Sequence, residues 1–170
     1  MTGGQEPHSS TIAQMRVEEL IGTIGEKGLA AGAGAAGAVT LALAAACAAK
    51  AAAISLEHQP YNDTLRRSQD VLERIGRFAL MGADRDAESF ATFIRENTLG
   101  SVVELLREGG KIIRLIDILA DTLEKVGPQV EPSVAGDVVA ARALMEAGRQ
   151  IQLTNSAEAQ AQKTRLTSTP

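Results

Sequence analysis

Apolar residues recur at intervals of three and four positions along most of the chain, which is the pattern of helices that bury one face. Ser9 and Ser10 can cap the first of these helices, and Gly25 and Gly28 can end it. Its apolar positions are Ile12, Met15, Leu20, Ile21 and Ile24. The sequence therefore predicts a first amphipathic helix that ends before residue 28.

Alanine and glycine dominate the next segment, which runs to about Leu56. Alanine is the best helix former, whereas a glycine in a helix interior costs about 1 kcal/mol relative to alanine. The glycines gather at the start of the segment, and alanines fill the remainder. We expect a glycine-rich turn from Gly32 to Gly37, and then a long helix that ends before Pro60.

Two more long helices are expected in the middle of the chain. The first is capped at Asn62 or Asp63 and runs to about Glu96. Its apolar positions include Leu65, Val71, Leu72, Ile75, Phe78 and Ala79. The second runs from Val102 to about Val126, and the adjacent Gly109 and Gly110 predict a break or kink within it.

A last helix is expected from a cap at Ser133 to about Gln162, after a loop bounded by prolines. No segment shows the alternation of a strand. A helix of roughly 25 residues is about 38 Å long, so we predict an all-α fold, an elongated bundle of about five helices. Residues 10–162 form one domain, with a flexible N-terminus at 1–9 and a disordered tail at 163–170.

Charge and cysteine content restrict the function classes. The net charge of -4 and the absence of a basic cluster argue against nucleic acid, which requires a basic face. The lone Cys47 cannot form an internal disulfide and has no neighbours for a zinc motif. We therefore expect a cytoplasmic protein without a metal site.

The uncharged stretch from Gly28 to Ala49 is about as long as a membrane span requires. Most of its residues are alanine and glycine, which gain little from lipid, so a buried helix without a membrane is the favoured interpretation. The start MTGGQEPHSS lacks the basic region of a secretory signal. The apolar stripe from Gly32 to Ala53 is too long for one subunit to cover, so we predict a homodimer or a higher symmetric oligomer.

Few residues stand out as chemical groups. The run GAGAAG is not followed by Lys and Ser, so close helix packing is favoured over a phosphate site. Asp84, Asp86 and Glu88 follow one another at intervals of two residues, which do not share a helix face, so a solvated charged run is favoured over a catalytic pair. Asp137 lies among small apolar residues, where a carboxylate can serve as a general acid or base. It can equally be a carboxylate that the dipole favours at a helix N-terminus.

Three segments, in order, resemble the formiminotetrahydrofolate cyclodeaminase and methenyltetrahydrofolate cyclohydrolase family. The first is AAGAGAAGAVTLALAAACA, a glycine-rich turn that leads into an alanine-rich helix. The second is DAESF at Asp86 to Phe90, which is similar to the family's aspartate-x-x-alanine-phenylalanine motif. The third is GDVVAARALMEAGRQIQLTN, similar to the family's serine-aspartate motif and the helix that ends in leucine-asparagine. The match extends loosely over most of the chain.

The resemblance implies a dimeric helical enzyme that performs acid and base chemistry on a one-carbon-substituted tetrahydrofolate or a related small molecule. Tetrahydrofolate would be the substrate, with no tightly bound cofactor and no metal. Asp86 and Asp137 would be the catalytic carboxylates. The implied substrate-binding residues are Gly32, Gly34, Tyr61, Phe90 and Asn155.

Some family features are absent from this chain. LEHQPY replaces the family's lysine-lysine-tyrosine stretch and keeps only Tyr61, and the C-terminal helix of the family is missing. A fold can persist after its chemistry has changed. The alternative is therefore a non-catalytic helical scaffold or binding protein that retains the family fold.

Overall fold

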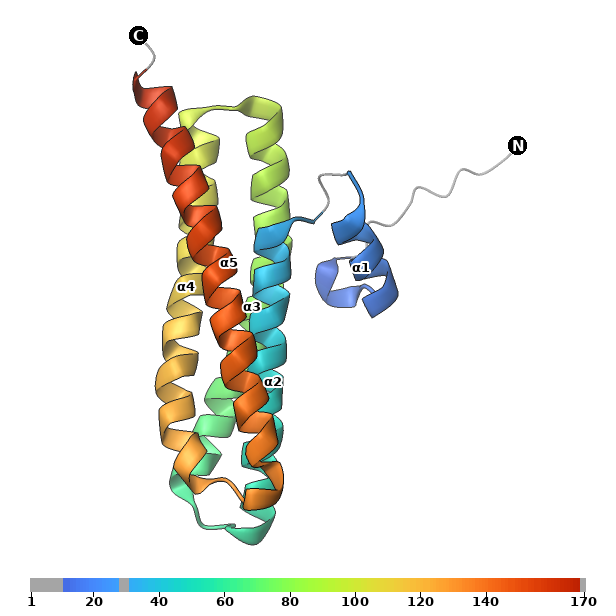
Figure 1. Ribbon diagram of the computed structural model, residues 1–170, viewed down its shortest axis with the longest axis vertical. Coiled ribbons are helices and arrows are strands. Elements are labelled where there is room, and N and C mark those ends of the chain that lie inside the picture. The colour runs from blue at the N-terminus through green and yellow to red at the C-terminus, as the bar shows by residue number, and fades with distance from the viewer. Residues whose placement is uncertain (1–10, 28–30, 169–170) are drawn as a thin grey trace, which may run out of the picture.

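The computed structural model describes residues 11–27 and 31–168, and these residues form helices without a strand. The α-helices are α1 (Val17–Gly25), α2 (Ala33–His58), α3 (Asp63–Glu96), α4 (Leu99–Val126) and α5 (Ala135–Ser168). Short 3-10 helices are η1 (Ile12–Gln14), η2 (Gly127–Gln129) and η3 (Pro132–Val134). Helices α2 to α5 form a long bundle, and α1 lies beside it (Figure 1). The predicted elongated all-α bundle of about five helices is confirmed.

Helix α2 contacts α3 and α5 along its length, and its small side chains allow close approach. Twelve of its residues are buried, most of them alanine. At its crossing with α5, a Cβ atom built on Gly148 would lie 3.2 Å from the carbonyl oxygen of Gly37. A Cβ atom on Gly37 would lie 2.9 Å from Cγ2 of Ile151. Glycine at both positions therefore sets how closely α2 and α5 pack.

Polar caps fix where the two central helices begin. The side chain of Asn62 accepts a hydrogen bond of 3.1 Å from the backbone N–H of Leu65 at the start of α3. At the start of α4, Thr98 and Ser101 form a capping box, in which each side chain satisfies a backbone N–H of the other. Asn97, the residue between α3 and Thr98, has a φ of 47°, a left-handed conformation that asparagine tolerates better than most residues. Asn97 and the capping box together produce the sharp turn between α3 and α4.

The glycine-rich segments differ from the sequence prediction. The predicted turn from Gly32 to Gly37 is wrong, because α2 begins at Ala33 and takes Gly34 and Gly37 into its first turns. The predicted break at Gly109 and Gly110 is also wrong, since α4 is continuous. Gly34, Gly37 and Gly109 each face a side chain of a neighbouring helix, and this packing offsets their low helix propensity.

The chain ends also differ from the prediction. Helix α5 continues past Gln162 to Ser168, so residues 163–168 are helical where the sequence predicts disorder. The first helix is shorter than predicted, because η1 precedes it and α1 begins only at Val17. The caps predicted at Ser9 and Ser10, the stop at Gly28 and the flexible segment 1–9 lie outside the described residues.

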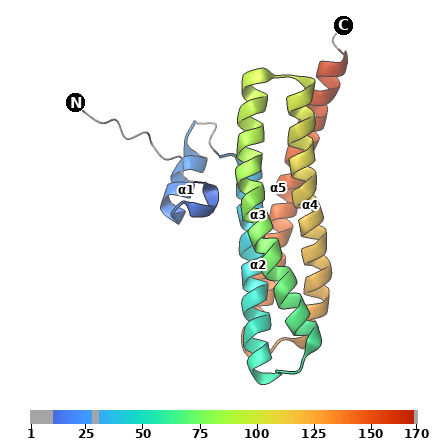
Figure 2. The same cartoon turned by 180° about the vertical axis from the view of Figure 1, so that it is seen from behind.

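Helix α1 is held near the bundle by the segment before it. Ile12 of η1 is buried, and its backbone N–H donates a hydrogen bond to Oδ1 of Asp84 in α3. The apolar face of α1 is open, with Val17 74% and Ile21 66% exposed. In both views, α1 lies to the side of the bundle that α2 to α5 form (Figure 1 and Figure 2).

Among the described residues, α2 is the one helix long and apolar enough to cross a membrane. Core helices of soluble proteins can be equally long and apolar. Of the most apolar 18-residue stretch of α2, 44% is buried within the bundle. Its contacts with α3 and α5 account for the buried part of this apolar surface. The cytoplasmic setting expected from the sequence stays a prediction.

Candidate functional site

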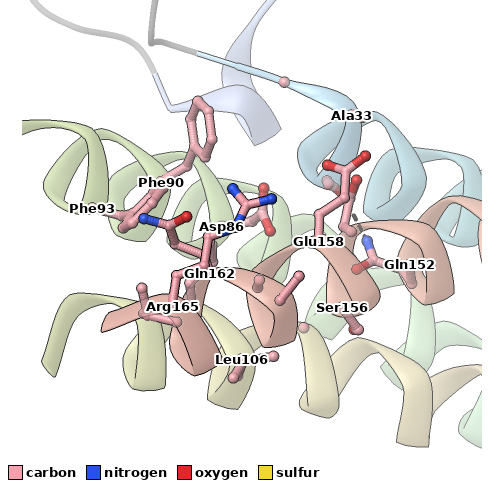
Figure 3. A pocket seen from close by; sticks show the side chains of 18 residues that line it. Ala33, Asp86, Phe90, Phe93, Leu106, Gln152, Ser156, Glu158, Gln162 and Arg165 are labelled. Atoms are coloured by element: carbon pink, nitrogen blue, oxygen red, sulfur yellow. Dashed lines mark hydrogen bonds between the residues drawn. The ribbon is translucent and has the colours of Figure 1, made fainter. Parts of the chain in front are cut away.

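A cavity of about 490 Å³ lies in the half of the bundle that contains the turn between α3 and α4. The first turn of α2, the later parts of α3 and α5 and the early part of α4 surround it. Its volume is within the range of small-molecule sites. Figure 3 shows the side chains that line it.

Asp86 is the buried acidic group of this cavity, with a relative exposure of 8%. Burial raises the pKa of its carboxyl from 3.8 to about 6, while a hydrogen bond from the backbone N–H of Ala35 acts in the opposite direction. The negative charge of Glu108 in α4 raises the pKa further. Asp86 can therefore exchange a proton near neutral pH, which is the property required of a general acid or base.

The first turn of α2 holds the Asp86 carboxylate. The opening N–H groups of an α-helix have no partner within the helix, and the helix dipole places partial positive charge there. In α2 the first intrahelical bond is donated by the N–H of Ala36, so the N–H of Ala35 remains available to Asp86. Gly34 leaves room for this contact, because a Cβ atom at that position would overlap the carboxylate.

Gln152 of α5 connects the cavity to the same turn of α2. Its side chain is 1% exposed, and Nε2 donates a hydrogen bond of 2.8 Å to the carbonyl oxygen of Gly34 (Figure 3). A buried amide without a partner would cost about 1 to 3 kcal/mol, so this bond constrains the side chain strongly. It fixes α5 against the residues that hold Asp86.

A second buried carboxylate, Glu108, lies on α4. It is 4% exposed and forms ion pairs with Lys111 at 2.6 Å and with Arg107 at 3.0 Å. The two cations compensate its charge, as a buried carboxylate requires. Glu108 therefore keeps a negative charge that acts on Asp86, and its two cationic partners lie on its own helix.

The walls of the cavity differ in polarity. Phe90 and Phe93 of α3 and Leu105 and Leu106 of α4 supply apolar surface. Helix α5 supplies amide and charged groups, which are Gln152, Asn155, Glu158, Gln162 and Arg165 (Figure 3). Such a combination suits a planar molecule with polar edges, which can rest on the rings and form hydrogen bonds at its rim. No three His, Cys, Asp or Glu side chains in residues 11–27 and 31–168 gather to hold a metal ion.

Five of the residues nominated from the sequence come together here. Gly32, Gly34, Asp86, Phe90 and Asn155 all line the cavity. They derive from α3, α5 and the start of α2, which are far apart in the sequence. Their functional roles remain predictions, but their proximity makes them parts of one site.

Asp137 and Tyr61 lie elsewhere in the chain. Asp137, at the start of α5, forms an ion pair of 3.1 Å with Lys50. It precedes Asn155 by 18 residues, so about 27 Å of continuous helix separates the two. Tyr61 is 92% exposed in the turn between α2 and α3, at the opposite end of the bundle (Figure 1). Within one chain, neither residue reaches Asp86.

Several residues of the site were not nominated from the sequence. Gln152, Glu108, Phe93 and Arg165 belong to long helices with ordinary amphipathic spacing, where nothing local distinguishes them. Gln152 carried the one usable signal, because the helical period places it on the same face of α5 as Ala141, Gly148 and Ala159.

Comparison with known proteins identifies the family. The sequence profile of the formiminotransferase-cyclodeaminase family matches residues 16–105, just over half of the chain. No curated protein sequence matches. Among solved structures, formiminotetrahydrofolate cyclodeaminase from Thermotoga maritima is similar with a TM-score of 0.81 and 21% identity, over 91% of this chain and 85% of that one. The chain belongs to the formiminotransferase-cyclodeaminase family.

Proposed function

We propose that this protein is an enzyme that performs acid and base chemistry at a carbon-nitrogen bond of a one-carbon-substituted tetrahydrofolate or a related small molecule. The reaction is cyclisation with loss of ammonia, or hydrolysis of a methenyl bridge. The observation that carries the proposal is Asp86, a buried carboxyl with a pKa of about 6 that lines a cavity of suitable size. The family membership supports the substrate class.

The chemistry needs a group that can both accept and release a proton. In cyclisation, the N10 nitrogen attacks the formimino carbon, and the carbon-nitrogen bond to the departing ammonia breaks. The ionised Asp86 would take the proton of the attacking nitrogen, and the protonated form would give a proton to the leaving nitrogen. A pKa near 6 makes both forms available near neutral pH. The proposed site uses no metal, and the folate is a substrate rather than a resident cofactor.

The cavity walls support a planar heterocyclic substrate. Phe90 and Phe93 offer faces on which a ring can pack, and the amides of Asn155 and Gln162 can each donate and accept hydrogen bonds. Arg165 adds a cationic group at the same wall. These groups provide polar contacts even though the chain has LEHQPY where its family has a lysine-rich stretch.

A non-catalytic scaffold or binding protein is the second candidate. It is favoured by the position of Asp137 and Tyr61, which leaves one of the two nominated carboxylates outside the cavity. Asp137 could reach Asp86 only from a second subunit. The two candidates differ in whether a reduced folate binds.

A thermal-shift titration with reduced folates tests the proposed function. We expect formimino- and methenyl-tetrahydrofolate to raise the Tm in a concentration-dependent manner, because a ligand that binds only the folded state stabilises it. A Phe90→Ala variant should lose this response, whereas the exposed Glu88→Gln variant on the same helix should retain it. A folded protein that responds to no member of the panel would favour the scaffold.

We also expect a homodimer. In the single chain Leu43 of α2 is 54% exposed and Val139 of α5 is 67% exposed, so these two packed helices leave apolar side chains uncovered. Light scattering should give twice the mass of one chain at micromolar concentration, and Leu43→Glu should shift the protein towards monomer. A well-folded wild-type monomer would contradict this prediction.

A further inference from the structure

The peptide group between Gly34 and Ala35 lies between two buried side chains that belong to different helices. On one side, Nε2 of Gln152 in α5 donates a hydrogen bond of 2.8 Å to the carbonyl oxygen of Gly34. On the other side, the carboxylate of Asp86 in α3 lies against the same turn, since a Cβ atom on Gly34 would overlap it, and the N–H of Ala35 lowers the pKa of that carboxylate. This carbonyl and this N–H are the two ends of one peptide unit.

We propose that Gln152 is a positioning residue for Asp86, and that it acts through the peptide group that joins Gly34 to Ala35. The inference rests on the proposed function only in treating Asp86 as the reacting carboxyl. Gln152 makes the peptide N–H a better donor and holds it in the orientation that faces the carboxylate.

Two physical effects support this role. A hydrogen bond to a carbonyl oxygen polarises the peptide group, and polarised groups in a chain of hydrogen bonds strengthen one another. The first turn of a helix is also its least constrained part, since its N–H groups lack intrahelical partners. The Gln152 bond adds a constraint from α5 at the residues where Asp86 needs a fixed donor.

The arrangement leaves little freedom to the two side chains. Gln152 is 1% exposed, and a Cβ atom at Gly37, one turn further along α2, would come within 3.0 Å of its Nε2 atom. A Cβ atom at Gly34 would overlap the Asp86 carboxylate. Both side chains therefore pack directly against the backbone of α2, in space that glycine leaves free.

Other charged groups lie around Asp86, of which Glu108 acts on it directly, and they must be kept constant in a test. Helix α4 contributes Glu108 with its partners Lys111 and Arg107, and α5 contributes Glu158 and Arg165 to the cavity wall. The first turn of α2, from Ala33 to Ala36, has no charged side chain. A neutral substitution of Gln152 leaves all of these charges unchanged.

Carbon-detected NMR titration of the Asp86 carboxyl in the full chain tests the proposal. In Gln152→Met, which keeps the length of the side chain but removes the amide, we expect the pKa of Asp86 to rise by roughly half to one pH unit, because its donor is weakened. Gln160→Met on the exposed face of α5 is the matched control and should leave the pKa at about 6. A Gln152→Met variant that loses Tm but keeps the pKa of Asp86 would show a purely structural role and overturn the proposal.

The unaltered protein offers a second measurement, which does not depend on whether the variant folds. As the pH is varied, the chemical shifts of the Ala35 backbone amide and the Gln152 side-chain amide should both change, each with a midpoint at the pKa of Asp86, because one peptide group connects them. A Gln152 amide that does not respond at that midpoint would contradict the proposal. Full turnover in Asp86→Asn would instead overturn the proposed function and leave this coupling intact.

Discussion

Replacing Asp86 by asparagine is expected to lower turnover by about a hundredfold to ten-thousandfold, the range typical for loss of a general acid or base. Asparagine keeps the size of the side chain and cannot exchange the proton. The assay measures kcat and KM on the folate derivative that binds in the thermal-shift experiment. Glu88→Gln, an exposed carboxylate on the same helix, is the control and should retain full turnover.

The same variant should remain folded, and its stability provides the check. The pKa of Asp86 is about 6 in the folded chain and has its ordinary value of 3.8 in the unfolded chain. Between these two pH values the folded state therefore binds more protons than the unfolded state. The free energy of unfolding therefore falls as pH rises through this window, and the cost of the buried charge is fully present above about pH 6. Asp86→Asn should be more stable than the wild type at pH 8, by about 1 to 3 kcal/mol, and should lose this advantage near pH 4.

Two outcomes would contradict the catalytic assignment of Asp86. Unchanged turnover in a folded Asp86→Asn protein would remove its chemical role, and equal stability of the two proteins at pH 8 and pH 4 would remove the shifted pKa. Asp137→Asn belongs in the same assay. A loss as large as that of Asp86→Asn would require Asp137 to act from the partner subunit, and unaffected turnover would exclude it from the site.

Gly34→Val is expected to destabilise the protein by roughly 1 to 3 kcal/mol and to abolish ligand binding. Gly34 is buried, and any Cβ atom there overlaps the Asp86 carboxylate, so the added side chain must displace either Asp86 or the start of α2. Denaturant unfolding measures the loss of stability, and the folate titration measures the loss of binding. Gly136→Val in the first turn of α5, where a Cβ atom meets nothing within 4 Å, is the matched control.

A double substitution locates the cause of this effect. If the conflict is with the Asp86 carboxylate, the cost of Gly34→Val should be smaller in an Asp86→Ala background, because the opposing atoms are gone. An equal cost in both backgrounds would mean that the added side chain destabilises the helix by another route. A variant with normal melting and normal ligand affinity would remove any special role for this turn.

Much of the fold could be predicted because its helices follow the simplest rule, the helical spacing of apolar residues. The long helices α3 and α4 and the cap at Asn62 follow directly from that spacing. The two glycine-rich segments, 32–37 and 109–110, were predicted wrongly for one reason. Helix propensity is a local quantity, whereas Gly34 and Gly109 are helical because another helix packs against them.

The candidate site was predicted less completely, because it is assembled across four helices. Of the residues that the family motifs nominate, Asp86, Phe90 and Asn155 line one cavity, whereas Asp137 of the same chain does not. Asp137 and Asn155 lie far apart along the continuous helix α5, and a sequence motif carries no information about that distance. Gln152 was missed because its importance comes from burial and from a partner on another helix, and Glu108 because its importance comes from burial and from its charge near Asp86.

The crossing of α2 and α5 at Gly37 and Gly148 has a consequence for how sequences of this kind can diverge. Each glycine leaves free the space that the other helix fills, so a larger residue at either position should force the helices apart and lengthen the distance from Gln152 to Gly34. Positions 37 and 148 should therefore change together among related sequences, and so should positions 34 and 86, as residues in contact tend to covary. A larger residue at the crossing should therefore alter the shape of the cavity without any change in the residues that line it.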